Sequence, residues 1–278
     1  MMAGVWLAGG RHDQEADEID LVIPVRVGEH NEQLRYALRS FAKHLPHGRV
    51  WIVGHKPTWL TGVHHIPTWQ GSSKYANTTR AVRAACEHPD VSEVFLLAND
   101  DMFAMERHEF MPVYHRGLVV EVEEYYRRRR IRSQYLEGMR ATRQLLARLG
   151  YEDPLSYEVH VPLPVDKSGM LEALEYGKSL PVVHKRTLYG NLAGLGGTRI
   201  RDPKVLHTGS MFPKDGPWLS TMSRSFTHGQ VGKWIRSRFP EPSRYEHPRP
   251  AAAAAVPVRA AQRRPVTVAG LRRAELRH

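Results

Sequence analysis

Residues 94–103, which read VFLLANDDMF, constrain this chain more than any other stretch. The first five are apolar without alternation, which is typical of a strand buried on both faces of a parallel sheet. The apolar run ends abruptly in Asn99, Asp100 and Asp101. Open α/β sheets bind ligands at the carboxyl ends of their strands, so these polar residues are predicted to lie at a ligand site.

Two adjacent carboxylates at one strand end are costly, because like charges a few ångströms apart resist joint ionisation. A divalent cation that bridges to a phosphate would relieve the repulsion, and oxygen ligands favour Mg²⁺ or Mn²⁺. Asp100 and Asp101 are therefore predicted as metal ligands. The alternative is a strand-to-helix turn in which one of the two carboxylates caps a helix.

The sequence before this strand predicts a nucleotide-binding α/β sheet. Strand-helix-strand units of this length form right-handed parallel crossovers. Apolar runs and amphipathic periodicity predict these elements in order: a strand at 19–25, a helix at 32–43 with Asn31 as its N-cap, a strand at 50–54 and a helix at 75–87.

The pattern is looser after residue 103. The predicted elements are a strand at 118–122, a helix at 133–149 stopped by Gly150, a helix at 168–176, a loop over 192–215 and a last amphipathic helix at 230–239. Residues 127–130 are four consecutive arginines. Such a run usually marks a solvated face, and the alternative is contact with a phosphate or an acidic acceptor.

Charge and composition narrow the class of protein. The net charge is +11, but the seven Arg and one Glu of residues 249–278 account for +6, which leaves +5 for the body of the chain. This balance disfavours a nucleic-acid-binding face. A single cysteine, Cys86, rules out an internal disulfide and favours the cytoplasm. No apolar run approaches the roughly 18 residues of a membrane span.

These observations divide the chain into three parts. Residues 1–18 are predicted to be a flexible N-terminus, residues 19–246 a single catalytic domain, and residues 247–278 a disordered tail rich in Ala, Pro and Arg. Within the domain, 19–105 is the expected nucleotide-binding half and 106–246 the expected acceptor and catalytic half.

Six segments in this order resemble the Stealth family of sugar-phosphate transferases, which includes capsular polysaccharide phosphotransferases and N-acetylglucosamine-1-phosphotransferase. The similar segments span roughly residues 19–246: IDLV from Ile19, EQLRYALRS from Glu32, LLANDDMF from Leu96, HVP from His160 with Asp166-Lys167, HKR from His184, and FPEPSRYE from Phe239. The resemblance implies a GT-A-like fold with a mainly parallel central sheet flanked by helices. Two acidic positions of the family are absent, since Val27 and the segment STMS from Ser220 stand in their places.

The resemblance also implies roles for individual side chains. Asp100 and Asp101 would bind the metal, with Asp101 also catalytic. Arg186 suits bidentate phosphate contact, with a surface ion pair as the alternative. His160 is expected to act as a general base or to contact the transferred phosphate, with a structural histidine as the alternative.

Weaker candidates for substrate binding remain. Asp166 would either orient His160 or cap the following helix. The other candidates are Arg35 and Arg39, whose alternative is a charged helix surface, together with Lys74, Asn77 and Asn99.

The sequence therefore predicts a metal-dependent glycosyltransferase that moves a sugar from a nucleotide-diphosphosugar to a hydroxyl of a glycan or protein. Stealth-like transfer of a sugar-1-phosphate is the close alternative. A non-enzymatic polyanion-binding protein that uses the basic helix and tail is the third.

Overall fold

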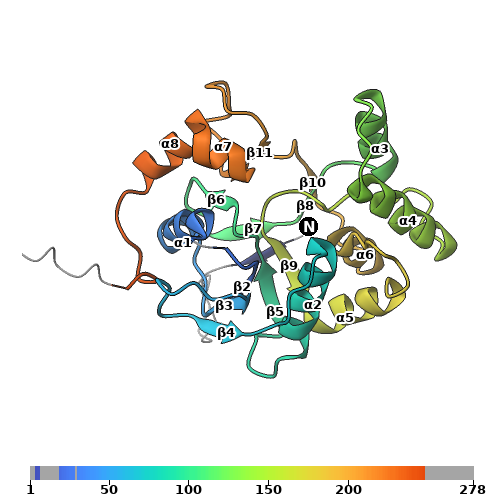
Figure 1. The fold of residues 1–278 in the computed structure, drawn as a ribbon. Helices are drawn as coiled ribbons and strands as arrows, with labels where there is room; N and C mark the ends of the chain where they lie inside the picture. Colours follow the sequence, from blue (N-terminus) through green and yellow to red (C-terminus); the bar gives the residue numbers. More distant parts are fainter. Residues whose placement is uncertain (1–3, 7–18, 29, 248–278) are drawn as a thin grey trace, which may run out of the picture. The chain divides into compact units, whose positions relative to one another are not determined.

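Five strands form the central sheet of the computed structural model, which describes residues 4–6, 19–28 and 30–247 (Figure 1). The strand order is β4-β3-β2-β5-β9. The first four of these pair in parallel and β9 adds antiparallel to β5. The strands are β2 Asp20–Val25, β3 Val50–Gly54, β4 His64–Ile66, β5 Val94–Leu97 and β9 Leu163–Asp166. The prediction of an α/β chain with a mainly parallel central sheet is confirmed, while the finer GT-A assignment remains a prediction.

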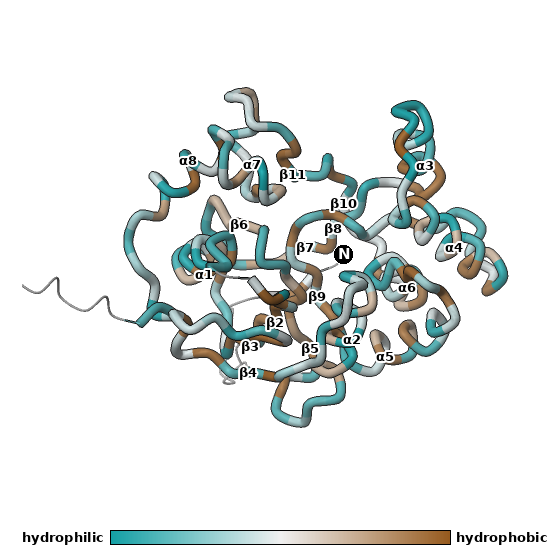
Figure 2. Tube along the Cα trace, in the orientation of Figure 1, coloured by the Kyte–Doolittle hydropathy of each residue, from teal (hydrophilic) through white to brown (hydrophobic). Residues whose placement is uncertain are grey.

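Helices cover both faces of this sheet because side chains alternate along each strand. In β2, Leu21 and Ile23 belong to one buried cluster and Val22 to the other. The first cluster includes residues of α1 Glu32–His44, α7 Ser223–His228 and α8 Gln230–Arg238. The second includes residues of α2 Lys74–Glu87, α5 Lys167–Tyr176 and α6 Lys185–Leu192. Figure 2 shows the apolar strands between helices of mixed polarity.

A second, three-stranded sheet begins directly after Asp101. Its order is β11-β12-β6, with β11 parallel and β6 antiparallel to β12. The strands are β6 Met102–Ala104, β11 Lys204–Val205 and β12 Trp218–Thr221. Because β6 follows the Asp pair in the chain, this pairing brings β11 and β12 beside the carboxyl end of β5.

Two helices form a smaller packing unit of their own. α3 Val119–Arg128 packs against α4 Gln134–Arg148 through Val119, Val122, Leu136 and Met139. The helix predicted at 133–149 is confirmed, and Gly150 follows it with a φ of +91°, in the left-handed region that favours glycine. The strand predicted at 118–122 is wrong. Val119 and Val122 lie at helical i, i+3 spacing and bury that face against α4, so tertiary packing overrode their preference for strands.

Other local predictions need correction. Asn31 does precede α1, but it has a φ of +43° and its side chain makes no capping bond; its Nδ2 instead donates to the backbone oxygen of Arg26 at 3.1 Å. The predicted loop 192–215 contains β11 and also β10 Thr198–Arg199, which pairs with β8 Tyr114–His115.

The expected division of the chain is also modified. Within the N-terminal segment predicted to be flexible, β1 Gly4–Trp6 pairs antiparallel with β7 Phe110–Pro112. The two expected halves share one core, since Leu96 and Phe226 belong to the same buried cluster and β9 completes the main sheet. Cys86 is buried, and burial raises the pKa of its thiol to about 12. The tail predicted at 247–278 lies outside the described residues from position 248 onward. None of the helices in the described part of the chain combines the length and apolar character needed to cross a bilayer.

Candidate functional site

A cavity of about 670 Å³ lies at the carboxyl end of the central sheet. This is the point where chain order reverses, because β3 and β5 pair with opposite edges of β2, and ligands bind at such switch points in open α/β sheets. The walls are the residues after β2, the loop before α2, the end of β5 and parts of the second sheet. The polar and charged side chains among them are Arg26, Gln33, Thr68, Gln70, Ser72, Lys74, Asn77, Thr78, Asn99, Asp100, Asp101, Lys204 and Ser223.

Side-chain to backbone bonds hold the loop before α2 against the end of β2. Gln70 donates from Nε2 to the oxygen of Val25 at 2.7 Å, and its Oε1 accepts from the nitrogen of Val27 at 3.0 Å. Gly54 allows the close approach, since it has a φ of +112° and a Cβ there would lie 2.4 Å from the oxygen of Val25. The wall formed by these two loops is therefore fixed by the fold.

Asn77 and Lys74, predicted to contact substrate, both line this cavity. Asn77 exchanges two hydrogen bonds with the backbone of Gly71, at 2.8 and 2.9 Å, so it holds the loop in place. Lys74 begins α2, with Ser73 as the N-cap accepting from the nitrogen of Ala76 at 3.3 Å. The structure thus gives Asn77 a positioning role and leaves Lys74 as a cationic side chain of the cavity.

The predicted Asp pair lies in the turn between β5 and β6, with Asn99 beside it, and all three residues line the cavity. Burial, followed by the charge of Asp101, raises the pKa of Asp100 to about 7, although Arg26 and Lys204 act in the opposite direction. Asp101 Oδ2 lies 2.8 Å from Lys204 Nζ, whereas the buried Oδ1 has no hydrogen-bond partner among the described residues.

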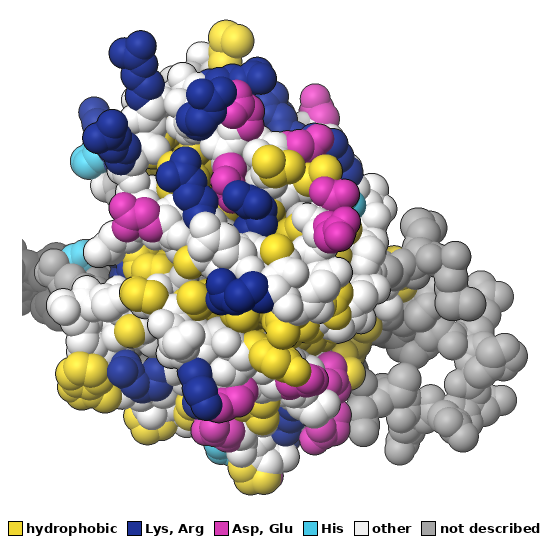
Figure 3. Space-filling view, turned by 90° about the vertical axis from the view of Figure 1, so that its right-hand side faces the viewer, with side chains coloured by type: hydrophobic (Ala, Val, Ile, Leu, Met, Phe, Trp, Pro, Cys, Tyr) yellow, Lys and Arg dark blue, Asp and Glu magenta, His cyan; other side chains and the backbone are white. Residues whose placement is uncertain are grey.

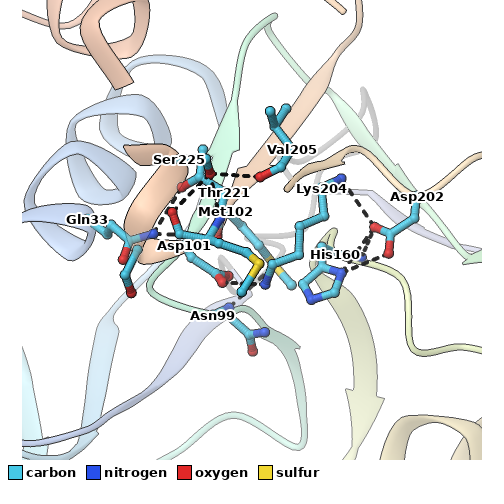
Figure 4. A network of polar contacts seen from close by, with 12 residues as sticks. Gln33, Asn99, Asp101, Met102, His160, Asp202, Lys204, Val205, Thr221 and Ser225 are labelled. Carbon is cyan, nitrogen blue, oxygen red and sulfur yellow. Dashed lines mark hydrogen bonds and ion pairs between the residues drawn. The ribbon is translucent and has the colours of Figure 1, made fainter. Parts of the chain in front are cut away.

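Lys204 connects the Asp pair to His160 (Figure 4). Its ammonium binds Asp101, and its backbone nitrogen donates to Asp202 Oδ1 at 3.4 Å. Both Asp202 oxygens lie 3.0 Å from His160 Nδ1. Burial alone would raise the pKa of Asp202, but the hydrogen bonds from His160 and the charges of His160 and Arg116 lower it to about 2. His160 is one-quarter exposed and does not itself line the cavity.

Arg186, predicted to bind phosphate, points at backbone oxygens instead. It is 5% exposed on α6, and its guanidinium donates to Val159 and Val161 at 2.7 and 2.9 Å and to Leu97 at 2.5 Å. Arg186 therefore ties the segment that carries His160 to the carboxyl end of β5. This is a positioning role, and the side chain does not line the cavity.

Three further predicted residues lie away from the cavity lining. Arg39 forms a two-point ion pair with Glu246 at 2.7 and 2.8 Å, and Arg35 contacts the same carboxylate at 3.6 Å while stacking over Trp59. Asp166 accepts from the nitrogen of Gly169 at 2.8 Å, so it is the N-cap of α5. Asp166 also pairs with Val94, at the end of β5 opposite to the Asp pair. The capping alternative describes Asp166 better than substrate binding.

Sequence reasoning missed Arg26, Gln33, Lys204 and Asp202. Arg26 follows a buried strand at its carboxyl end, so the same rule that selected the Asp pair would have found it. Gln33 donates to Thr221 Oγ1 at 2.9 Å, which ties α1 to β12. No sequence pattern identifies Lys204 or Asp202, because a pairing of short strands more than 100 residues from the Asp pair places them.

The predicted cation site can be tested against these side chains. Asp100 and Asp101 supply carboxylates, but Lys204 already occupies one oxygen of Asp101. The resemblance would place further acidic residues at Val27 and within the segment 220–223, and Val27, Met222 and Ser223 line the cavity. Across the described parts of the chain, no group of three or more His, Cys, Asp or Glu side chains could hold a metal ion. The described side chains therefore offer a cation two carboxylates, one of them paired with Lys204, and the metal site stays a prediction.

Comparisons with known proteins assign no relative. No protein-family model matches the chain, and no curated protein matches it.

Proposed function

We propose that this protein is a transferase that uses a nucleotide-diphosphosugar and moves its sugar to a hydroxyl of a glycan or protein acceptor. The observation that carries the proposal is the cavity at the switch point of the sheet, where Arg26, Lys74 and Lys204 meet Asp100 and Asp101. The cations suit the diphosphate, and the carboxylates suit hydroxyl groups of the sugar. The cavity volume of about 670 Å³ is within the range of small-molecule sites.

In this reaction the acceptor hydroxyl loses its proton to a base while its oxygen attacks the anomeric carbon. The bond from that carbon to the phosphate oxygen breaks, and a nucleoside diphosphate leaves with the electron pair. Positive groups near the diphosphate stabilise the charge that develops on this leaving group.

His160 is the candidate base. A carboxylate held on Nδ1 by two contacts of 3.0 Å fixes the proton on that nitrogen and leaves the Nε2 lone pair available. Asp202 is then a positioning residue, as the carboxylate is in other carboxylate–histidine pairs. The link through Lys204 connects this pair to the cavity.

A second candidate is transfer of the sugar-1-phosphate, in the manner of the Stealth family. Here the acceptor oxygen attacks the phosphorus next to the sugar, and a nucleoside monophosphate leaves. One observation favours sugar-1-phosphate transfer. Three segments compared with the Stealth family are far apart in sequence, and one residue from each, Val27, Asp100 and Ser223, lines the same cavity.

The released nucleotide separates the two reactions. The purified chain is incubated with a panel of nucleotide-sugars and simple glycan acceptors, with and without Mn²⁺, and the products are resolved by chromatography. Nucleoside diphosphate supports glycosyl transfer and nucleoside monophosphate supports sugar-1-phosphate transfer. His160→Ala should lower the rate of either reaction at least about 100-fold, with Lys178→Ala, at an exposed position after the end of α5, as the control. Absence of nucleotide-sugar binding under every condition would refute the proposal.

Polyanion binding remains the proposal from another class. Figure 3 shows Lys and Arg side chains most frequent in the upper half of the face that carries α3 and α4, with acidic side chains among them. Arg127 and Arg128 of α3 both pair with Glu124, so one carboxylate offsets one of the four positive charges of residues 127–130. Deleting residues 248–278 tests this reading, because a loss of heparin binding with unchanged nucleotide binding would confine that role to the tail.

A further inference from the structure

Lys204 occupies a position that no sequence pattern marks, and the fold specifies that position closely. Lys204 pairs with Ser220 in β12, and Ser220 pairs with Met102 in β6, so the register aligns Lys204, across β12, with the residue that follows Asp101. The ammonium lies 2.8 Å from Asp101 Oδ2, and both side chains are mostly shielded, at 18% and 17% exposure. Such a shielded ammonium is held by its ion pair, since lysines are seldom buried unpaired.

The cavity already holds the positive charge that a diphosphate needs. Its side chains include the cations Arg26, Lys74 and Lys204 and the carboxylates Asp100 and Asp101. Arg26 donates to Ser223 Oγ at 3.2 Å, so its guanidinium reaches the first residue of α7 across the cavity. An ammonium has three donors, and the ion pair with Asp101 uses one of them on the protein. The remaining donors of Lys204 suit phosphate oxygens.

We propose that Lys204 replaces the divalent cation at this site, so that the chain binds the diphosphate of its donor without a metal. The inference rests on the proposed function, because it concerns how the same site holds the same donor. A lysine supplies a compact positive charge at the carboxylate that a metal would otherwise bridge. The uncharged residues Val27 and Ser223 agree with this assignment, because a site without a cation has no need of additional carboxylates.

The test is isothermal titration calorimetry of the full chain with inorganic pyrophosphate and with UDP, GDP, ADP, CDP and dTDP, in EDTA and in Mn²⁺. We expect at least one nucleoside diphosphate to bind with affinities that differ less than about threefold between the two conditions. Lys204→Met should weaken that binding in EDTA by about 10- to 100-fold, the loss of one charge-assisted hydrogen bond. Lys204→Arg should retain most of it, and Lys178→Met, at an exposed position after the end of α5, is the matched control.

Mn²⁺ provides a second readout. Lys204→Met frees the carboxylate of Asp101 from its ion pair, so Mn²⁺ should restore part of the variant's nucleotide affinity while leaving wild-type affinity unchanged. Binding by the wild type only in Mn²⁺, or equal binding by Lys204→Met and wild type in EDTA, would overturn the inference and leave the proposed function standing. Absence of binding by every probe in both conditions would overturn the proposed function and this inference with it.

Discussion

Asp20 and Asp101 are carboxylates at opposite ends of the same sheet, and they differ in how completely they are paired. Asp20 begins β2 and is 1% exposed. Its two oxygens accept from the backbone and side chain of Arg49, from Trp51 Nε1 at 2.8 Å and from the nitrogen of Ser92 at 3.0 Å. Asp101 has one partner, Lys204, and a buried Oδ1 without a hydrogen bond among the described residues.

The comparison distinguishes a structural carboxylate from a functional one. Buried polar groups are normally satisfied, because an unmade hydrogen bond is expensive. At the amino end of the sheet Asp20 has enough partners to be fully satisfied by the protein. At the carboxyl end, Asp100 has a raised pKa and Asp101 keeps an unused oxygen, so these groups have interactions left for a ligand.

The largest effect on stability is expected at Asp20, whose carboxylate is fully hydrogen-bonded at the amino end of the sheet. Asp20→Asn should lower the free energy of unfolding by about 3–5 kcal/mol, the cost of breaking a buried, hydrogen-bonded ion pair. Arg49 is half exposed, which favours the lower part of that range. Urea unfolding measures the change, and nucleotide affinity of the folded variant should match the wild type. A loss below about 1 kcal/mol would show that Asp20 is not structural.

Substitutions of Arg186 test whether this side chain has a structural role or binds the ligand. Arg186→Met should cost about 2–4 kcal/mol, because three buried backbone oxygens lose a charged donor. Arg186→Lys is the informative companion, since it keeps the charge and loses the fork geometry. If Arg186→Lys kept its stability but lost nucleotide affinity, the phosphate role predicted from sequence would replace the positioning role.

The sequence predicted three of the five strands of the central sheet and half of the site, for physical reasons that apply within short segments. Buried strands and amphipathic helices are read from local periodicity, so β2, α1, β3, α2 and β5 were found within a residue or two. The Asp pair followed from its place at a strand end. Lys204 and Asp202 were not found, because two-residue strands such as β11 carry no periodicity and their pairing depends on distant segments.

Arginine roles were the least predictable part of the site. Arg186 was expected to contact phosphate, and Arg35 and Arg39 were candidates for substrate binding with a charged helix surface as the alternative. Each of the three has protein partners. A guanidinium binds carboxylates and backbone oxygens as readily as phosphates, so residue type cannot choose between them. Of the three cavity cations, Lys74 was a candidate from the sequence, Arg26 follows from its place at a strand end, and Lys204 is identified only by the three-dimensional arrangement.

Substitution of Asp202 should change the free energy of unfolding less than substitution of Asp20 or Arg186, and the change should depend on pH. The folded-state pKa of about 2 lies below the ordinary value of 3.8, so the stabilisation is fully present above about pH 4 and is lost as pH falls toward 2. Asp202→Asn should cost about 2 kcal/mol at pH 7 and about 1 kcal/mol near pH 3. Urea unfolding at both pH values measures the difference, and a pH-independent cost would contradict the pairing with His160.

Asp100→Asn should have the smallest effect on stability and the most informative effect on binding. The substitution is the same as at Asp20, but here it removes a charge that is buried beside a like charge, so stability should change by less than about 1 kcal/mol or rise. If Lys204 replaces the metal ion, removing the negative charge of Asp100 should also strengthen pyrophosphate binding in EDTA, because the cavity then has one charge fewer that repels the ligand. A site that needs a metal would respond in the opposite way and lose pyrophosphate binding in Mn²⁺. Calorimetry of Asp100→Asn with pyrophosphate therefore distinguishes two roles for this carboxylate. It either binds a metal ion or lies next to the bound ligand without one.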